Sequence, residues 1–224
     1  MLTQPVLLLP GTLCTAAVFS RQLSALQAAG HDVRVVPFRE ESSISQMAET
    51  VMTYLPADTA VSLAGFSMGG MVIMELLARV PDRVQRVALL NTNCHAEVPE
   101  RHEARKANIA EARRNGIRAV VNERLLPHYL YRQRPDHAGL ILDMAEDQGI
   151  ECLEAQSKAL ANRRDSTEIL RQADCAALVL GGLHDALCPV SEQQKIHRLM
   201  PRSHLRILEN CGHFSLLEQA SEVN

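Results

Sequence analysis

A serine flanked by glycines is the first indication of chemistry in this chain. Residues 65–70 read Gly-Phe-Ser-Met-Gly-Gly, after an apolar run at 59–64 and before a helix-like segment that stops at Pro81. A strand, a tight glycine-flanked turn with a central serine, and a helix together form the G-x-S-x-G nucleophile elbow. The glycines allow a turn too tight for larger side chains, so Ser67 would stand exposed at the edge of a sheet. The pattern predicts nucleophilic catalysis by Ser67, and a purely structural glycine-rich turn is the alternative.

A serine hydroxyl needs a base, usually a histidine that a carboxylate holds in place. After such a turn the chain order is serine, acid, histidine. Asp185 is the candidate acid, because it directly follows a predicted buried strand in a glycine-rich turn. His213 is the candidate base among nine histidines, because it lies in a glycine-containing loop after the last predicted strand. An aspartate that only caps the next helix is the alternative for Asp185, and His184 is a weak rival for His213.

Two backbone N–H groups are needed to bind the oxyanion that forms on an attacked carbonyl. Met68 supplies one by its position directly after the candidate nucleophile. The second should come from the loop after the first predicted strand, residues 9–14. Pro10 has no N–H and Gly11 shapes the turn, so Thr12 is the first choice and Leu13 the second.

We expect the substrate pocket to be shaped by residues of the segment 95–174 that the sequence does not single out, and by four residues near these loops: Leu13, Phe66, Met71 and Cys94. The six cysteines show neither a C-x-x-C pair nor a Cys/His zinc spacing, so we expect no disulfide, no metal and no cofactor. A cysteine- or metal-based enzyme using Cys94 or Cys211 remains an alternative. It predicts sensitivity to thiol reagents or chelators.

Composition narrows the possible partners. The chain has 224 residues, of which 46% are apolar and 22% charged, and its formal net charge is −3. Such a charge gives no indication of nucleic-acid or acidic-membrane binding. No apolar run approaches the ~18–20 residues that span a bilayer, and residues 1–9 lack the features of a signal peptide. We therefore expect a cytoplasmic protein acting on a small molecule, with an oligomeric state that the sequence does not determine.

Short apolar segments alternate with helical ones along most of the chain. This alternation predicts an α/β fold with a mostly parallel sheet covered by helices on both faces. A helix over Ala17–Ala28 should end near Gly30, and Ser43 with Gln46 resembles a capping box at the start of the next helix. The six predicted strands are Val6–Leu9, Val33–Pro37, Val61–Ala64, Val84–Leu90, Ala177–Leu180 and Leu205–Leu208.

About eighty residues without a strand pattern interrupt this alternation. An insertion of that length is more often functional than a plain loop, and open α/β sheets bind ligands at their carboxyl edge. We therefore expect residues 95–174 to form a helical cap over that edge, between core segments 1–94 and 175–224. A structural helical subdomain away from the site is the alternative. The expected cap helices are Glu103–Asn115, Ile117–Leu126, Ala138–Gln148 and Cys152–Ala161.

The motifs at 7–12, 65–70, 182–185 and 211–214 resemble the α/β-hydrolase superfamily. More narrowly, the chain resembles its single-domain bacterial members with a helical cap, of the carboxylesterase and 3-oxoadipate enol-lactonase type. The resemblance implies a hydrolase core and the triad Ser67, Asp185 and His213. Larger relatives have two further strands before the first predicted strand, so we expect a six-stranded sheet here. Many relatives have histidine where Pro10 stands. Relatives also continue with a further helix where this chain has eleven residues after His213, so the last helix is either very short or cut off.

These patterns together predict a serine hydrolase that cleaves a small carboxylic ester or lactone through an acyl-enzyme. The same three residues would also serve a thioesterase or a C–C bond hydrolase. A non-catalytic ligand-binding protein on the same fold is the alternative from another class.

Overall fold

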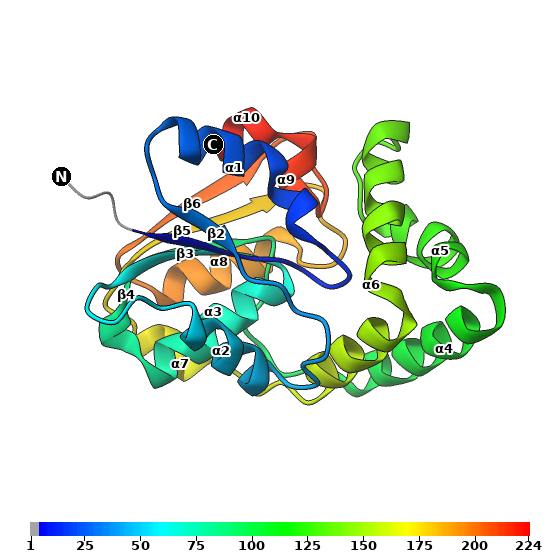
Figure 1. The fold of residues 1–224 in the computed structure, drawn as a ribbon, viewed down its shortest axis with the longest axis horizontal. Helices are drawn as coiled ribbons and strands as arrows, with labels where there is room; N and C mark the ends of the chain where they lie inside the picture. Colours follow the sequence, from blue (N-terminus) through cyan, green and yellow to red (C-terminus); the bar gives the residue numbers. More distant parts are fainter. Residues whose placement is uncertain (1–4) are drawn as a thin grey trace.

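A six-stranded, all-parallel sheet organises the chain in the computed structural model, which describes residues 5–224 (Figure 1). Residues 1–4, assigned above to the first core segment, lie outside the described residues. The strand order is β2-β1-β3-β4-β5-β6, and helices cover both faces of the sheet. The predicted fold class is confirmed. The strands are β1 (Val6–Leu9), β2 (Val33–Val35), β3 (Val61–Phe66), β4 (Val84–Leu90), β5 (Ala176–Gly182) and β6 (Ser203–Leu208).

Strands β1 and β4 occupy their predicted ranges, and the other four differ at their ends. Strand β2 stops two residues before Pro37, a residue that has no N–H for a sheet hydrogen bond. Strand β3 runs on to Phe66 and β5 to Gly182, so each reaches the turn that carries a candidate site residue. Because every neighbouring pair is parallel, all these turns meet at one carboxyl edge of the sheet.

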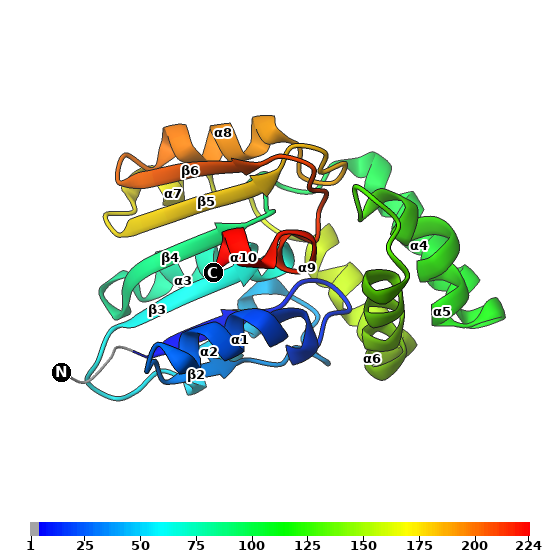
Figure 2. The same cartoon turned by 90° about the horizontal axis from the view of Figure 1, so that it is seen from above.

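The two faces of the sheet bury two separate apolar clusters. In β1, Leu7 and Leu9 belong to one cluster, and Val6 and Leu8 belong to the other, as the two-residue period of a strand requires. Figures 1 and 2 show one helical layer on each side. The larger layer holds α2 (Ile44–Thr53), α3 (Met68–Arg79), α7 (Thr167–Gln172) and α8 (Val190–Leu199). The smaller layer holds the 3₁₀ turn Ala16–Phe19, α1 (Ser20–Ala28), α9 (Ser215–Glu218) and α10 (Ala220–Val223).

The positions where α1 and α2 begin depend on the residues directly before and within their first turns. Ser43 caps α2, because its side chain accepts a hydrogen bond from the Gln46 N–H at 3.1 Å. The Gln46 side chain in turn accepts from the N–H of Ser42, one residue before the position that a capping box uses. The predicted helix 17–28 is divided, with a 3₁₀ turn before α1.

The segment between β4 and β5 projects beyond the carboxyl edge of the sheet (Figure 1). It contains α4 (Pro99–Asn115), α5 (Ile117–Val120), the π turn Val121–Leu125, the 3₁₀ turn Leu126–His128 and α6 (Pro135–Ala161). A residue with φ of +80°, Gly149, interrupts α6 where the sequence predicts a break. Helix α7, later in the same segment, packs against α3 and α8. In the described part of the chain, no helix is both long enough and apolar enough to cross a membrane.

Glycines let α3 lie directly against the sheet. A Cβ atom on Gly69 would lie 2.0 Å from the carbonyl oxygen of Leu9 in β1. A Cβ atom on Gly65 would lie 2.5 Å from the backbone of Gly69. Any larger residue at either position would push α3 away from β1 and β3, and the turn between β3 and α3 would have to move.

We therefore expect Gly69→Ala to lower the free energy of unfolding by ~1–3 kcal/mol or more, because the new methyl group meets backbone that cannot move aside. Gly139→Ala in α6 is the matched control, because no neighbouring atom lies within 4 Å of its added Cβ. The control should leave stability unchanged or raise it by up to ~1 kcal/mol, since alanine favours helices. Urea unfolding of both variants measures the difference, and equal stability of the two would contradict this account of α3.

Candidate active site

Ser67 occupies the turn between β3 and α3 in a backbone conformation that side chains rarely adopt. Its φ is +51°, in the region that favours glycine. Hydrogen bonds hold the turn on both sides: the Ser67 N–H donates to Leu90 O at 2.9 Å, and Thr92 Oγ1 donates to Ser67 O at 2.7 Å. Strand β4 and the residues after it therefore fix the serine, and its hydroxyl is left to face the cavity above the sheet edge.

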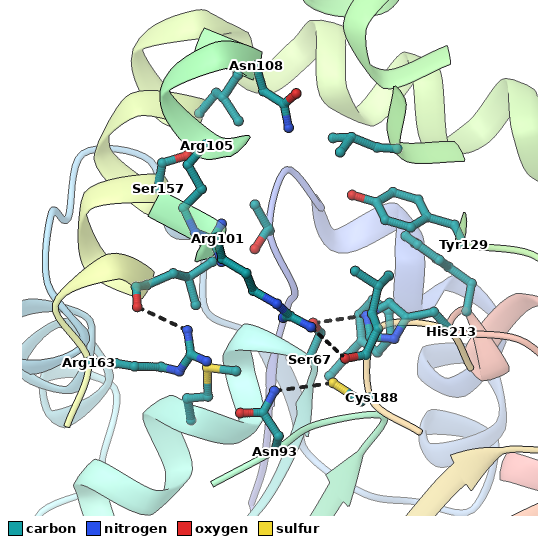
Figure 3. Close-up of a pocket in the computed structure, with 18 residues that line it drawn as sticks. Ser67, Asn93, Arg101, Arg105, Asn108, Tyr129, Ser157, Arg163, Cys188 and His213 are labelled. Atoms are coloured by element: carbon teal, nitrogen blue, oxygen red, sulfur yellow. Dashed lines mark hydrogen bonds between the residues drawn. The ribbon is translucent and has the colours of Figure 1, made fainter. Parts of the chain in front are cut away.

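The three candidate residues meet in a hydrogen-bonded row, although they come from three separate loops. Ser67 Oγ lies 3.0 Å from His213 Nε2 (Figure 3). His213 Nδ1 lies 2.8 Å from Asp185 Oδ2 and 3.0 Å from Oδ1. Nucleophile, base and carboxylate thus have the mutual geometry that a serine hydrolase requires.

Asp185 is completely buried and is held as an acceptor. Its Oδ1 accepts from the N–H groups of Leu187 and Cys188 at 2.9 and 2.8 Å, and its Oδ2 accepts from Asn91 Nδ2 at 2.9 Å. Burial acts to raise the pKa of Asp185, but the neighbouring His213 and these hydrogen bonds outweigh it, and the pKa lies below its usual value. The carboxylate is therefore ionised at neutral pH and can hold a proton on His213 Nδ1.

The loop that carries His213 is bound to the segment before α6. The His213 N–H donates to Tyr129 O at 2.7 Å. The Glu218 carboxylate accepts from the N–H groups of Gly212 and Tyr131 at 2.9 and 2.8 Å, and burial raises its pKa. Glu218 thus joins the histidine loop to the inserted segment. No motif in the sequence marks Glu218, because its importance comes only from where the chain folds back.

The candidate oxyanion donors differ in their surroundings. Met68 is the first residue of α3, where a helical N–H has no acceptor within its own helix. Thr12 lines the cavity beside Ser67, and none of the described residues accepts its N–H. The N–H of Leu13, the second choice, donates to Gln156 Oε1 of α6 at 2.8 Å. The Leu13 N–H is therefore occupied, and Thr12 is the better placed of the two.

The cavity above Ser67 is small, about 130 Å³. Of the four predicted pocket residues, Phe66 and Met71 line it. Leu13 and Cys94 are not among its lining residues, because Leu13 is buried beside α6 and Cys94 lines a neighbouring cavity. The segment between β4 and β5 contributes further lining side chains, which the sequence did not identify individually because it carries no information on how α4 and α6 lie over the sheet. They include Arg101, Arg105, Asn108, Tyr129, Leu153, Ser157 and Leu160.

Cys188, which lines the cavity, and the nearby Cys94 and Cys211 are poorly suited to act as nucleophiles. Burial raises the pKa of Cys188 to about 12, and it also raises the pKa values of Cys94 and Cys211. All three thiols are therefore protonated at neutral pH and are weak nucleophiles. In residues 5–224, the one group of side chains with metal-ligand spacing is Asp185, Cys188 and His213. Hydrogen bonds already occupy both Asp185 oxygens, and the protonated Cys188 thiol accepts from Asn93.

A family model described as "Alpha/beta hydrolase family" matches residues 6–224. The chain is 26% identical over 204 residues to a pimeloyl-[acyl-carrier protein] methyl ester esterase of Neisseria meningitidis, covering 88% of this chain but only 64% of that protein, just under two thirds. A second Neisseria meningitidis esterase of this name is also 26% identical and is covered over 78% of its length.

Two solved structures have the same fold. An esterase from Thermogutta terrifontis with malate bound has a TM-score of 0.87 and 26% identity, covering 98% of this chain and 86% of that one. The enol-lactonase from Burkholderia xenovorans LB400 has a TM-score of 0.83, covering 99% of this chain and 88% of that one. At 22% identity, the second likeness shows the fold alone.

The burial of the cysteines provides a direct test of the cysteine-based alternative. All six are buried and free, so the native protein should react with a thiol reagent such as DTNB far more slowly than the unfolded protein, which should show six thiols. Any catalytic activity that depends on Ser67 should survive brief exposure to the reagent. Rapid modification of one thiol together with loss of activity would favour the cysteine-based alternative.

Proposed function

The chain belongs to the alpha/beta hydrolase family and is an enzyme of that family, and we propose that it cleaves a small carboxylic ester or lactone with Ser67 as nucleophile. The observation that carries the proposal is the row from Ser67 Oγ through the His213 ring to the Asp185 carboxylate, with spacings of 3.0 and 2.8 Å. The similarity to methyl ester esterases over most of the chain supports an ester as substrate.

In this mechanism Ser67 Oγ attacks the substrate carbonyl, and its proton passes to His213 Nε2. The N–H groups of Met68 and Thr12 bind the oxyanion. His213 then gives the proton to the leaving oxygen, so that the alcohol departs and the acyl group remains on Ser67. A water molecule activated by His213 attacks the acyl-enzyme, which releases the acid and restores Ser67. Asp185 keeps His213 in the Nδ1–H tautomer and stabilises its cation. The steps use no metal or cofactor.

The inserted helices complete the proposal as a cap over the site. We propose the division into core segments 1–94 and 175–224 with the insertion 95–174, in which α4, α5 and α6 form the cap and α7 packs with the core layer. Cavity-lining residues from α4 and α6, together with the small cavity volume, support a cap that restricts the substrate to a short acyl or alcohol group. Thioesters and C–C bonds require the same nucleophile and base, so profiling of substrates separates these alternatives.

Replacing the nucleophile tests the proposal. Ser67→Ala should reduce hydrolysis of p-nitrophenyl acetate by as much as about a millionfold and abolish labelling by a fluorophosphonate. Ser24→Ala, at an exposed serine of α1, should behave like the wild type. If the folded wild type neither hydrolyses esters nor labels at Ser67, the proposed function fails and a ligand-binding role is favoured.

Replacing the acid tests the role of Asp185 in two ways. Asp185→Asn should lower kcat by about ten-thousandfold, because an amide cannot hold the working tautomer of His213. The folded pKa of Asp185 is depressed, so its contribution to stability is present above the unfolded pKa of about 3.9 and is lost as pH falls through the folded value.

The variant should therefore be less stable than the wild type at pH 7, and the difference should narrow below about pH 4. Denaturant unfolding at pH 7 and pH 3 measures it. Asp143→Asn is the control, because Asp143 is an exposed residue of α6 outside the cavity. A difference that widens as pH falls would contradict the assigned ionisation of Asp185.

A further inference from the structure

Three arginines line the cavity above Ser67, and we call them the arginine cluster: Arg101, Arg105 and Arg163. Arg101 and Arg105 are one turn apart on the half-buried face of α4, and Asn108 follows on the same face. Figure 3 shows the Arg101 side chain extending from α4 into the cavity. In the described part of the chain, no aspartate or glutamate lines this cavity. The cavity wall is therefore positively charged.

One carboxylate neutralises only part of this charge. Glu97, whose side chain is completely buried, accepts from Arg105 Nε at 2.8 Å and pairs with Arg163 Nη1 at 3.1 Å. Burial acts to raise the pKa of Glu97, but the two arginines outweigh it and the pKa lies below its usual value. Glu97 is thus an anion shared by two guanidinium groups. One negative charge against three positive ones leaves two positive charges in the wall of the cavity.

Of the three arginines, Arg101 is the one whose charge is not paired with a carboxylate. Among residues 5–224 its guanidinium pairs with no carboxylate and donates one hydrogen bond, from Nη2 to Leu187 O at 3.4 Å. Leu187 belongs to the loop whose N–H groups hold Asp185, so Arg101 reaches from α4 to the edge of the candidate site. Asp185 forms no ion pair with Arg101 and does not line the cavity; its oxygens accept from Asn91, Leu187, Cys188 and His213.

Arg163 adds an unsatisfied donor to the same wall. Only 4% of its side chain is exposed, with Nε donating to His95 O at 2.9 Å and Nη1 to Leu160 O at 3.0 Å. Its Nη2 is buried and has no partner. A buried donor without an acceptor is unfavourable, which leaves the Arg163 guanidinium only partly satisfied by the protein. Arg105 and Arg163 are held by Glu97, whereas the guanidinium of Arg101 has only the long hydrogen bond to Leu187 O.

We infer that the arginine cluster binds a carboxylate of the substrate while Ser67 attacks an ester or lactone carbonyl elsewhere on the same molecule. The inference rests on the proposed function for the reaction itself. A planar carboxylate matches the paired N–H groups of a guanidinium, and it is smaller than a phosphate in a cavity of about 130 Å³. The substrate class is then a half-ester or lactone of a short dicarboxylic acid.

Isosteric ester pairs test this directly. For monomethyl succinate, glutarate and adipate, kcat/KM is compared with that of the same ester carrying a primary amide in place of the free carboxylate. The wild type should prefer the acid by about tenfold or more for the chain length that fits, and the preference should fall as salt increases. Arg101→Gln should reduce the ratio of acid to amide by about tenfold, and Arg101→Lys should retain part of it.

Arg113→Gln is the matched control, because Arg113 lies on the exposed side of α4 with its guanidinium paired to Glu154. Its acid-to-amide ratio should equal that of the wild type. An equal rate for acid and amide in the wild type, an Arg101→Gln ratio like that of the control, or a preference for a phosphorylated ester of equal length would overturn the inference.

Binding without catalysis separates this inference from the proposed function. Ser67→Ala protein titrated with succinate, glutarate and adipate by calorimetry should bind the fitting acid, and adding Arg101→Gln should weaken binding by about tenfold. If the acid binds in this Arg101-dependent way but the wild type hydrolyses no ester, the subsite stands and the reaction was assigned wrongly. If esters are hydrolysed but no dicarboxylate binds, the reaction stands and the carboxylate subsite is refuted.

Discussion

The close approach of α3 to β1 and β3 is the constraint on which the rest of the site depends. At Gly69 the helix backbone leaves no room even for a methyl group against Leu9. This contact forces the chain to reverse within one residue, and Ser67 takes a φ of +51° as a result. The same reversal makes Met68 the first residue of α3, where its N–H has no acceptor within the helix. A glycine that serves packing thereby determines both the exposure of the candidate nucleophile and the position of a candidate oxyanion donor.

A buried polar network carries this geometry across the sheet edge. Ser215 donates to Asn91, Asn91 donates to Asp185, and Asp185 holds the ring of His213. Each group is removed from water, so each loses free energy if its partner moves, and the network tolerates few alternative arrangements. The three loops that follow β4, β5 and β6 are held to a common geometry in this way. The network stays polar in the middle of two apolar clusters because every member of this chain of contacts has a partner.

The inserted helices bring to the site a charge that the core does not provide. Core residues around Ser67 are apolar or neutral, such as Phe66, Met71 and Thr12, whereas α4 and the loop after α6 contribute arginines. Charges in a cavity with little water interact more strongly than charges at the surface. In this arrangement the core holds the groups proposed to react, and the insertion holds the groups that would select among substrates. Glu218 and the backbone of Tyr129 join the two parts, so the selecting groups have a definite position relative to the candidate nucleophile.

The sequence alone determined the alternation of strands and helices, the turn at Ser67 and the chain order of the candidate acid and base. These features are local or periodic, and each depends on residue type at a fixed spacing: Val and Leu in short runs, glycines around Ser67, a loop after each strand. The carboxyl edge where Asp185 and His213 would meet Ser67 followed from parallel strand order. What only the tertiary structure decided is how the insertion lies over that edge. Three contacts illustrate this: Leu13 N–H with Gln156, Tyr131 N–H with Glu218, and Arg101 with Leu187 O. Each joins residues more than eighty positions apart in the sequence. Such contacts depend on the packing of whole helices, which no spacing along the chain encodes.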